Sequence, residues 1–192
     1  MLLEALLDAS KPPLANATAG LDYLLASPFR YPPRHGGSRF RDANAPGVFY
    51  GAQHVRTACA ELGYWRWKFL HYAVDLARIE PVAHTAFSVD VATPAVDLRA
   101  PPFDRDAAVW MHPSNYAPCQ AFAAVAREAE VGGIVYQSVR DPRKAWCIAV
   151  LTPTAFAKRK PNAEKQTWWL AVAQDKVVWR RNEQSCVFAQ GA

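Results

Sequence analysis

The sequence lacks the short motifs that identify many nucleotide-binding, metal-binding and hydrolytic proteins. Neither G-x-G-x-x-G nor G-x-x-x-x-G-K-[S/T] occurs, which excludes a Rossmann turn and a P-loop as the means of holding a nucleotide. The five histidines follow no H-x-x-x-H spacing and form no cluster with cysteine, so no metal site is indicated. G-x-S-x-G, the nucleophile elbow of many hydrolases, is absent as well.

Cysteine is scarce, and long apolar runs are missing. The four cysteines form no C-x-x-C pair, and three lie within apolar runs, which is typical of buried free thiols in a reducing compartment. No stretch approaches the length of a membrane span. The start, MLLEALLDASKPP, contains Glu4 and has no basic segment before its short apolar stretch, unlike a signal peptide. We therefore expect a cytoplasmic protein.

Length and composition fit one soluble globular domain. At 192 residues the chain can bury roughly 70% of the surface that its unfolded form exposes. The 22 Lys and Arg residues outnumber the 17 Asp and Glu residues, and this net charge of +5 favours anionic ligands or partners. No repeat or low-complexity tract interrupts the sequence. We expect a single domain over 1–192, with its recognisable motifs between about 23 and 190.

The spacing of apolar residues predicts several helices. We expect a short helix at the start of the chain and a helical turn from Leu21 that ends before Pro28. Longer helices are predicted from about residue 53 and over about 117–130, the latter with Gly132 as its C-terminal stop. The buried face predicted for the first long helix comprises Val55, Ala58, Cys59, Leu62, Trp65, Phe69 and Tyr72. That predicted for the second comprises Phe122, Val125, Ala126 and Ala129.

Alternating or continuous apolar patterns predict strands at 84–91, 133–139, 146–151 and 167–181. The second of these segments places Ile134, Tyr136 and Ser138 on one face. The third reads as a central strand covered on both sides, and the fourth as two strands around a Gln-Asp-Lys turn. The seven tryptophans mostly lie in apolar patterns, and core packing explains them. The predicted fold class is α+β, in a single compact domain.

Two arginines suggest recognition of an anion. The guanidinium of arginine matches phosphate oxygens in pairs, and Arg39 and Arg41 point to the same side if their segment is extended. Gly36 and Gly37 before them would allow a ligand to approach the backbone. On residue type alone, two solvated arginines on a surface turn are the commoner arrangement.

Glu61 lacks the usual explanation for a surface glutamate. It lies beside the predicted buried face, near Tyr64 and Trp65, and no basic residue stands three or four positions away. A carboxylate edged by aromatic rings can bind a sugar hydroxyl and stabilise positive charge on a sugar ring. The alternative is an unpaired, exposed glutamate.

Ser138 lies at the end of a predicted strand, where functional side chains often enter a cleft. No histidine is near it in sequence, so a hydrogen-bonding role is favoured over nucleophilic attack.

Five stretches together resemble the RES domain, a family named for an Arg, a Glu and a Ser. They are FRYPP (29–33), GSRFR (37–41), GVFYGA (47–52), TACAELGYWR (57–66) and GGIVYQSVR (132–140). They follow the family's order and cover nearly the whole chain. Many members read GGRWN at the second stretch, so Phe40 and Arg41 here replace a Trp and an Asn.

The resemblance implies a fold similar to ADP-ribosyltransferase toxins, with a split β-sheet core and flanking helices around NAD+. It also implies the toxin of a toxin–antitoxin pair, whose partner is an Xre-like helix-turn-helix antitoxin that covers the active site. NAD+ is then the substrate, and no metal is expected.

Carried over by position, Arg39, Glu61 and Ser138 match the name-giving residues, which are the expected catalytic residues. The residues expected to bind NAD+ are Arg30, Tyr31, Arg39, Tyr50 and Ser138. In this interpretation arginines bind the pyrophosphate, tyrosines pack the nicotinamide and its ribose, and Glu61 faces the ribose whose glycosidic bond breaks.

The acceptor of ADP-ribose stays open at this point: phosphate, water and a protein side chain are all compatible with the resemblance. An alternative of another class is a nucleic-acid-binding or RNA-cleaving toxin. The positive net charge fits that alternative, but no RNA-binding motif or basic stripe with interleaved aromatic residues is present, so we expect no direct nucleic acid binding.

Overall fold

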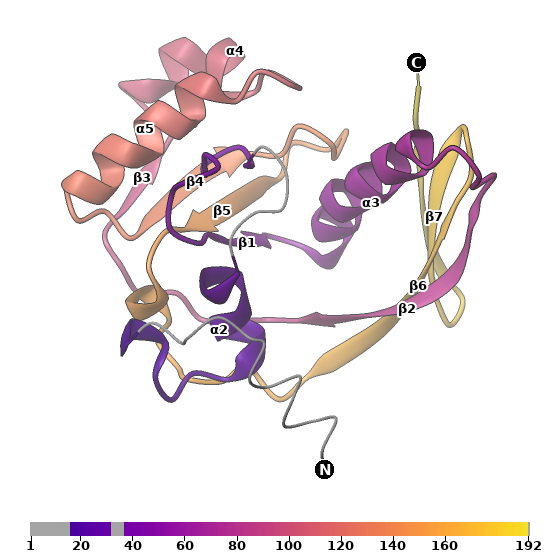
Figure 1. Cartoon of the computed structure of the whole chain (residues 1–192), viewed down its shortest axis with the longest axis horizontal. Coiled ribbons are helices and arrows are strands. Elements are labelled where there is room, and N and C mark those ends of the chain that lie inside the picture. Colours follow the sequence, from indigo (N-terminus) through magenta and orange to yellow (C-terminus); the bar gives the residue numbers. More distant parts are fainter. Residues whose placement is uncertain (1–15, 32–36, 192) are drawn as a thin grey trace.

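The computed structural model describes residues 16–31 and 37–191, which form two four-stranded sheets and four α-helices (Figure 1). The first sheet has the order β1-β5-β4-β3 and the second the order β2-β6-β7-β8. The strands of the first sheet are β1 (Phe49–Ala52), β5 (Trp146–Val150), β4 (Gly133–Gln137) and β3 (Ala95–Asp97). Those of the second are β2 (Ile79–Phe87), β6 (Lys165–Val172), β7 (Lys176–Arg181) and β8 (Gln184–Ala189). The helices are α2 (Tyr23–Arg30), α3 (Val55–Tyr72), α4 (Ala107–Trp110) and α5 (Ala117–Glu128), and the predicted α+β class is confirmed.

The first sheet is built around β5, as its continuous apolar run predicts. This strand pairs antiparallel with β1 on one side and β4 on the other. Cys147 and Ala149 face a core that α5 covers, whereas Val150 faces a second core with Leu25 of α2. Figure 1 shows α4 and α5 together on one side of this sheet. Burial on both faces explains why the segment shows no alternation.

The second sheet supports α3. The predicted pair of strands within 167–181 is confirmed as β6 and β7, which join through a turn in which Ala173 N donates to Lys176 O at 2.9 Å. α3 lies against these strands (Figure 1), and the Trp179 indole donates to Cys59 O at 3.0 Å. A Cβ at Gly63 would lie 2.7 Å from Val177 Cγ1, so the helix and β7 approach closely.

The face that α3 buries differs from the predicted one. Its buried residues are Thr57, Cys59, Ala60, Gly63 and Leu70. Five of the expected core residues are instead exposed: Ala58, Leu62, Trp65, Phe69 and Tyr72, the last four at 38–72%. Small side chains let the helix approach the sheet closely, and this packing outweighs the burial of the more hydrophobic face. The expectation that tryptophans lie in the core is also wrong for Trp169, which is 49% exposed.

Two helix ends differ from prediction. α2 continues through Pro28 to Arg30, where Leu25 and Ala26 are buried and tertiary packing offsets the missing hydrogen bond. α5 ends at Glu128 and is followed by Glu130 in the left-handed region (φ 55°), so Gly132 is not its stop. A Cβ at Gly132 would lie 1.9 Å from Thr93 Oγ1, which gives that glycine a packing role instead.

The predicted buried face of α5 is partly wrong. Ala126 is buried and Phe122 packs on the core, but Val125 and Ala129 are exposed, and Cys119 and Ala123 complete the buried face.

Among the strands, β2 begins before Pro81 and ends at Phe87, earlier than predicted, and a register shift between Ile79 and Val82 accommodates the proline. All four cysteines are free thiols, and Cys59, Cys119 and Cys147 are buried, as predicted. The helix expected at the start of the chain lies outside the described residues. Among the helices that the structure describes, none has the length and apolar composition to cross a membrane.

We predict that Gly63→Val lowers the free energy of unfolding by about 1–3 kcal/mol, because the new side chain would overlap Val177 and Trp179. Urea unfolding measures the change. Arg66→Val on the exposed side of the same helix is the control, and it should cost less than about 1 kcal/mol through helix propensity alone. Equal stability of the two variants would contradict the close packing of α3 on β7.

Candidate functional site

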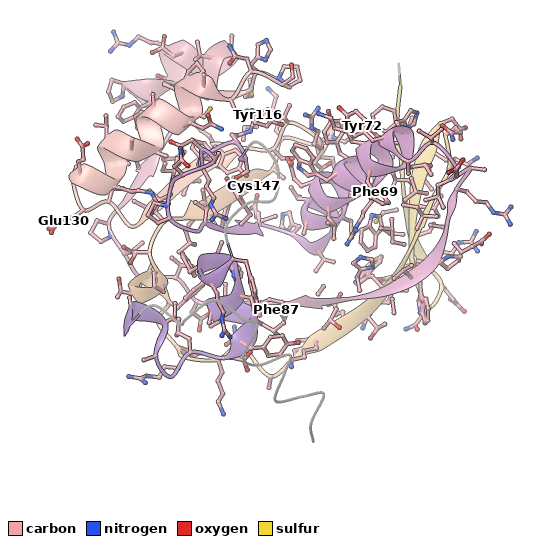
Figure 2. The ribbon with its side chains drawn as sticks, viewed as in Figure 1. Phe69, Tyr72, Phe87, Tyr116, Glu130 and Cys147 are labelled. Atoms are coloured by element: carbon pink, nitrogen blue, oxygen red, sulfur yellow. The ribbon has the colours of Figure 1, made fainter. Side chains whose placement is uncertain are left out.

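A cavity of about 390 Å³ lies where the turn at 38–41, β1 and α3 meet above β4 and β5. Its lining includes Arg39, Tyr50, Glu61, Trp65, Tyr116 and Tyr136. Figure 2 shows Tyr116 and Cys147, two lining residues from distant parts of the chain, in the region between α5 and α3. Among the described residues, the only charged side chains in this lining are Arg39 and Glu61. The cavity therefore combines one cation, one carboxylate and several aromatic rings.

A tight turn places Arg39 in the cavity. Ser38 N donates to Arg41 O at 2.6 Å and Arg41 N to Ser38 O at 3.2 Å, so Arg39 and Phe40 form the tip of the turn. Phe40 is fully buried and packs on the Tyr136 ring at 4.9 Å, which fixes the turn in the core of the first sheet. Gly37 is required before the turn because its φ is +80° and a Cβ there would lie 2.3 Å from Arg41 O.

The expectation that Arg39 and Arg41 share one side is wrong because the segment is not extended. Arg41 turns away from the cavity and donates to Ala45 O at 3.2 Å and to Tyr31 O at 3.0 Å. Its role is to join two parts of the loop that precedes β1. The glycine expected to admit a ligand, Gly37, is explained by the turn itself, and Gly36 lies outside the described residues.

Arg39 is 8% exposed, which excludes the alternative of a solvated surface arginine. Its Nη1 donates to Trp110 O at 2.7 Å and to His112 O at 3.0 Å, and its guanidinium lies 4.6 Å from the Tyr116 ring centre. Arg140 holds the same segment by donating to Pro113 O. Arg39 thus gives the cavity its positive charge and also holds in place the segment that bears Tyr116.

Glu61 and Ser138 are in direct contact. The Ser138 hydroxyl donates to Glu61 Oε1 at 2.6 Å, and Val139 N donates to the same oxygen at 3.2 Å. Glu61 is half-buried, so it is not the unpaired, exposed glutamate of the alternative. Within the described residues, Glu61 Oε2 accepts no hydrogen bond. One carboxylate oxygen is therefore fixed by the protein and the other remains able to accept from a ligand.

Ser138 is arranged to orient the carboxylate rather than to attack a substrate. It is 3% exposed, its single proton is directed to Glu61, and its oxygen accepts from Asp141 N at 3.0 Å. No described base lies in position to remove its proton other than Glu61 itself. This agrees with the hydrogen-bonding role that the sequence favours.

Two tyrosines contribute uncharged walls. Tyr50 Oη accepts from Phe40 N at 3.0 Å and pairs with Ser38 Oγ at 2.8 Å, while the residue as a whole is 39% exposed. Burial of its hydroxyl raises the pKa of Tyr50, and the hydrogen bonds to Ser38 and Phe40 offset this only in part. Burial, followed by the nearby Cys147 and Glu61, raises the pKa of Tyr136 well above its usual range. Both phenols are therefore protonated near neutral pH.

The structure does not bring Arg30 and Tyr31 into this cavity. The Arg30 guanidinium lies 5.9 Å from the Tyr31 ring centre, and Tyr31 is 43% exposed. Neither residue is part of the lining. Both stand next to residues 32–36, which the structure does not describe.

Sequence reasoning missed several lining residues. Trp65 was expected in the core, although its position one turn from Glu61 pointed to the same neighbourhood. Tyr136 shares a predicted strand face with Ser138, so that alternation was a usable signal. No signal in the sequence pointed to Tyr116. It reaches the cavity because Arg39 binds the segment that bears it, and that segment lies more than seventy positions after Arg39 in the sequence.

A larger cavity of about 780 Å³ lies on the other side of β1 and shares Tyr50, Gly51, Ala52 and Ala58 with the first. Among the residues described, its lining contains no Arg or Lys, and Glu164 is its only carboxylate. An anionic ligand therefore has its charged partner in the smaller cavity. In the part of the chain that the structure describes, no group of three or more His, Cys, Asp or Glu side chains could hold a metal ion.

Comparison with known families agrees with this site. The family model described as the RES domain matches residues 13–173, which span Arg39, Glu61 and Ser138. No curated protein matches the chain. The resemblance inferred from five short stretches is thereby confirmed over most of the sequence, and the chain belongs to the RES domain family, whose functions are toxin-like and NAD-related.

Proposed function

We propose that this protein binds NAD+ and breaks its nicotinamide–ribose bond. The observation that carries the proposal is one aromatic-walled cavity in which a buried arginine faces a carboxylate fixed by Ser138. Membership of a family with NAD-related function supports it at a coarser level.

The two ends of the ligand match different parts of the cavity. Arg39 is the cation for the pyrophosphate, since a guanidinium binds phosphate oxygens through several parallel donors. The rings of Tyr50, Trp65 and Tyr116 offer faces for the nicotinamide, which is a cation in NAD+ and is attracted to aromatic faces. Glu61 Oε2 is available for a ribose hydroxyl.

Bond cleavage needs little proton transfer. As the bond between ribose C1′ and the pyridinium nitrogen breaks, its electron pair moves to that nitrogen and nicotinamide leaves as a neutral molecule. Positive charge develops on the ribose as an oxocarbenium-like transition state. The Glu61 carboxylate stabilises this charge, and the hydrogen bonds from Ser138 and Val139 keep it oriented without reorganisation. An acceptor then completes the reaction at C1′, and it is phosphate, water or a protein side chain.

The proposed partner is an Xre-like helix-turn-helix antitoxin that covers the cavity; RES domain proteins are typically toxins paired with antitoxins. Support comes from the apolar stripe on α3 that the fold leaves uncovered. Leu62 and Trp65 line the cavity, and Phe69 and Tyr72 continue the stripe away from it at 54% and 72% exposure. An exposed apolar stripe of this kind marks a protein interface. A partner seated on it would also block the entrance at Trp65.

A nucleic-acid-binding or RNA-cleaving toxin is the second candidate, and the site favours it less. The single cation of the cavity faces a carboxylate, whereas nucleic acid grooves combine several cations with stacking rings. The net charge of +5 remains its main support.

We expect the purified protein, free of antitoxin, to release nicotinamide from NAD+. Products are identified by mass spectrometry in buffer alone, with added phosphate, and with candidate acceptor proteins, which separates the three acceptors. Folded protein that releases no nicotinamide under any of these conditions would contradict the proposed function.

Glu61→Gln should lower kcat by about a hundredfold to a thousandfold while NAD+ affinity changes little, because the lost charge acts in the transition state. Glutamine keeps an oxygen that accepts from Ser138 and Val139, so the fold should survive. Kinetics and NAD+ binding are measured on the same preparation, with Glu80→Gln, an exposed residue of β2, as control. Full turnover of the Glu61→Gln variant would remove Glu61 from the mechanism.

Arg39→Lys should raise the KM for NAD+ about tenfold to a hundredfold, because a hydrogen bond to a charged group is worth about 1.5–3 kcal/mol. Lysine is preferred to alanine because it retains a cation and a donor for the carbonyls of Trp110 and His112. The matched variant Arg41→Lys lies outside the cavity and should leave KM within about twofold. Equal KM values for both variants would place the pyrophosphate away from Arg39.

A further inference from the structure

Hydrogen bonds attach the loop that follows β4 to α3 at two places. At its start, Ser138 and Val139 donate to Glu61. Three residues later, Asp141 Oδ2 accepts from the Thr57 hydroxyl at 2.9 Å, and Thr57 lies one helical turn before Glu61. The two attachments are joined through the loop itself, because Asp141 N donates to Ser138 Oγ at 3.0 Å.

Asp141 is a buried carboxylate with a full set of partners. Its side chain is 2% exposed, and Oδ1 accepts from Arg56 Nη1 and from Arg143 N. Burial by itself would raise the pKa of Asp141, but the hydrogen bonds from Arg56, Arg143 N and Thr57 outweigh it and lower the pKa below its usual value. Asp141 is therefore ionised near neutral pH, and its charge is compensated by Arg56.

Arg56 extends the same connection to the second sheet. Its guanidinium lies 4.9 Å from the ring centre of Phe188 in β8 and is 23% exposed. The loop after β4, the first turn of α3 and the edge of the second sheet are thus linked through one ion pair. None of these contacts enters the cavity, since Arg56, Thr57 and Asp141 are absent from its lining.

We infer that Asp141 is a positioning residue for Glu61. By binding Thr57 and Arg56, it holds the loop beside the turn of α3 that bears Glu61, where Ser138 and Val139 fix the Glu61 carboxylate. This inference rests on the proposed function for its effect on catalysis. Without the Asp141 carboxylate, the loop that bears the Ser138 and Val139 donors loses its attachment to Thr57 and Arg56, and Glu61 loses its fixed orientation. The consequence falls on the rate of bond cleavage rather than on binding, because Asp141 touches no ligand.

The geometry also explains why Asp141 follows Ser138 at a separation of three. With that spacing the Asp141 N–H reaches back to Ser138 Oγ while its carboxylate reaches Thr57. The Ser138 oxygen then accepts a hydrogen bond from Asp141 N, and the Ser138 hydroxyl proton is directed to Glu61.

A double-mutant cycle tests whether Asp141 acts through Glu61. Asp141→Asn should lower kcat about tenfold with KM for NAD+ unchanged within about twofold. Added to Glu61→Gln, the same change should lower the residual kcat by less than about twofold, because the group that it positions has already lost its charge. Equal losses in both backgrounds would show an independent effect and would overturn the inference.

Amide hydrogen exchange gives a second readout that needs no turnover. Val139 N–H donates to Glu61, so Asp141→Asn should speed its exchange about tenfold. The matched control Asp97→Asn changes a carboxylate of β3 that accepts from Arg99 and, among the described residues, from no donor of this loop, and it should leave Val139 unchanged. Unchanged Val139 exchange in the Asp141→Asn variant would overturn the inference. A wild-type protein that releases no nicotinamide would refute only the proposed function, and the exchange measurement would still test whether Asp141 positions Glu61.

Thr57 supplies a pair of variants if Asp141→Asn does not fold. Thr57→Val removes the hydroxyl that binds Asp141 Oδ2. Like Asp141→Asn, it should lower kcat and speed Val139 exchange, but both changes should be smaller. Thr57→Ser keeps that hydroxyl and should retain the wild-type kcat and exchange within about twofold. If valine and serine at this position behave alike, the hydrogen bond to Asp141 does not position Glu61.

Discussion

The contact between the Ser138 hydroxyl and Glu61 is the interaction on which the site depends. Glu61 belongs to a helix that packs on the second sheet, and Ser138 directly follows β4 of the first sheet. A half-buried carboxylate is costly unless donors compensate it, so this contact both satisfies the charge and joins the two sheets at one point. The cavity lies beside this contact. Its cation, Arg39, belongs to a turn that packs on the same face of β4 through the contact between the Phe40 and Tyr136 rings.

The second constraint is how closely α3 lies on its sheet. Residues with small side chains, Gly63 and Ala60 among them, face β6 and β7, whereas four large apolar residues of the helix are exposed: Leu62, Trp65, Phe69 and Tyr72. The same helix therefore supplies the carboxylate, one aromatic wall and an uncovered apolar stripe. In the proposed pairing with an antitoxin, a single binding event would both inhibit the protein and bury the exposed Trp65 and Phe69 beside the cavity.

The sequence predicted those parts of the fold that depend on local pattern. The alternation of Ile134, Tyr136 and Ser138, the central strand at 146–151 and the β6–β7 turn are all visible in single segments. The buried face of α3 was not predictable in this way, because hydrophobicity favoured one face and the fit of Gly63 against Val177 selected another. The burial of Arg39 depends on carbonyls at 110 and 112, and the network at Asp141 on Thr57, so both arise from contacts between residues distant in sequence. Family resemblance identified Arg39, Glu61 and Ser138 where local pattern left them ambiguous.

In the proposed mechanism, Glu61 and Arg39 bind one NAD+ molecule between them. A crystal structure of the protein with an NAD+ analogue whose glycosidic bond cannot break tests it most directly. We expect a hydroxyl of the nicotinamide ribose within about 3 Å of Glu61 Oε2 and the pyrophosphate against the Arg39 guanidinium. An analogue seated wholly in the larger cavity, with Glu61 bound only to Ser138 and Val139, would contradict it.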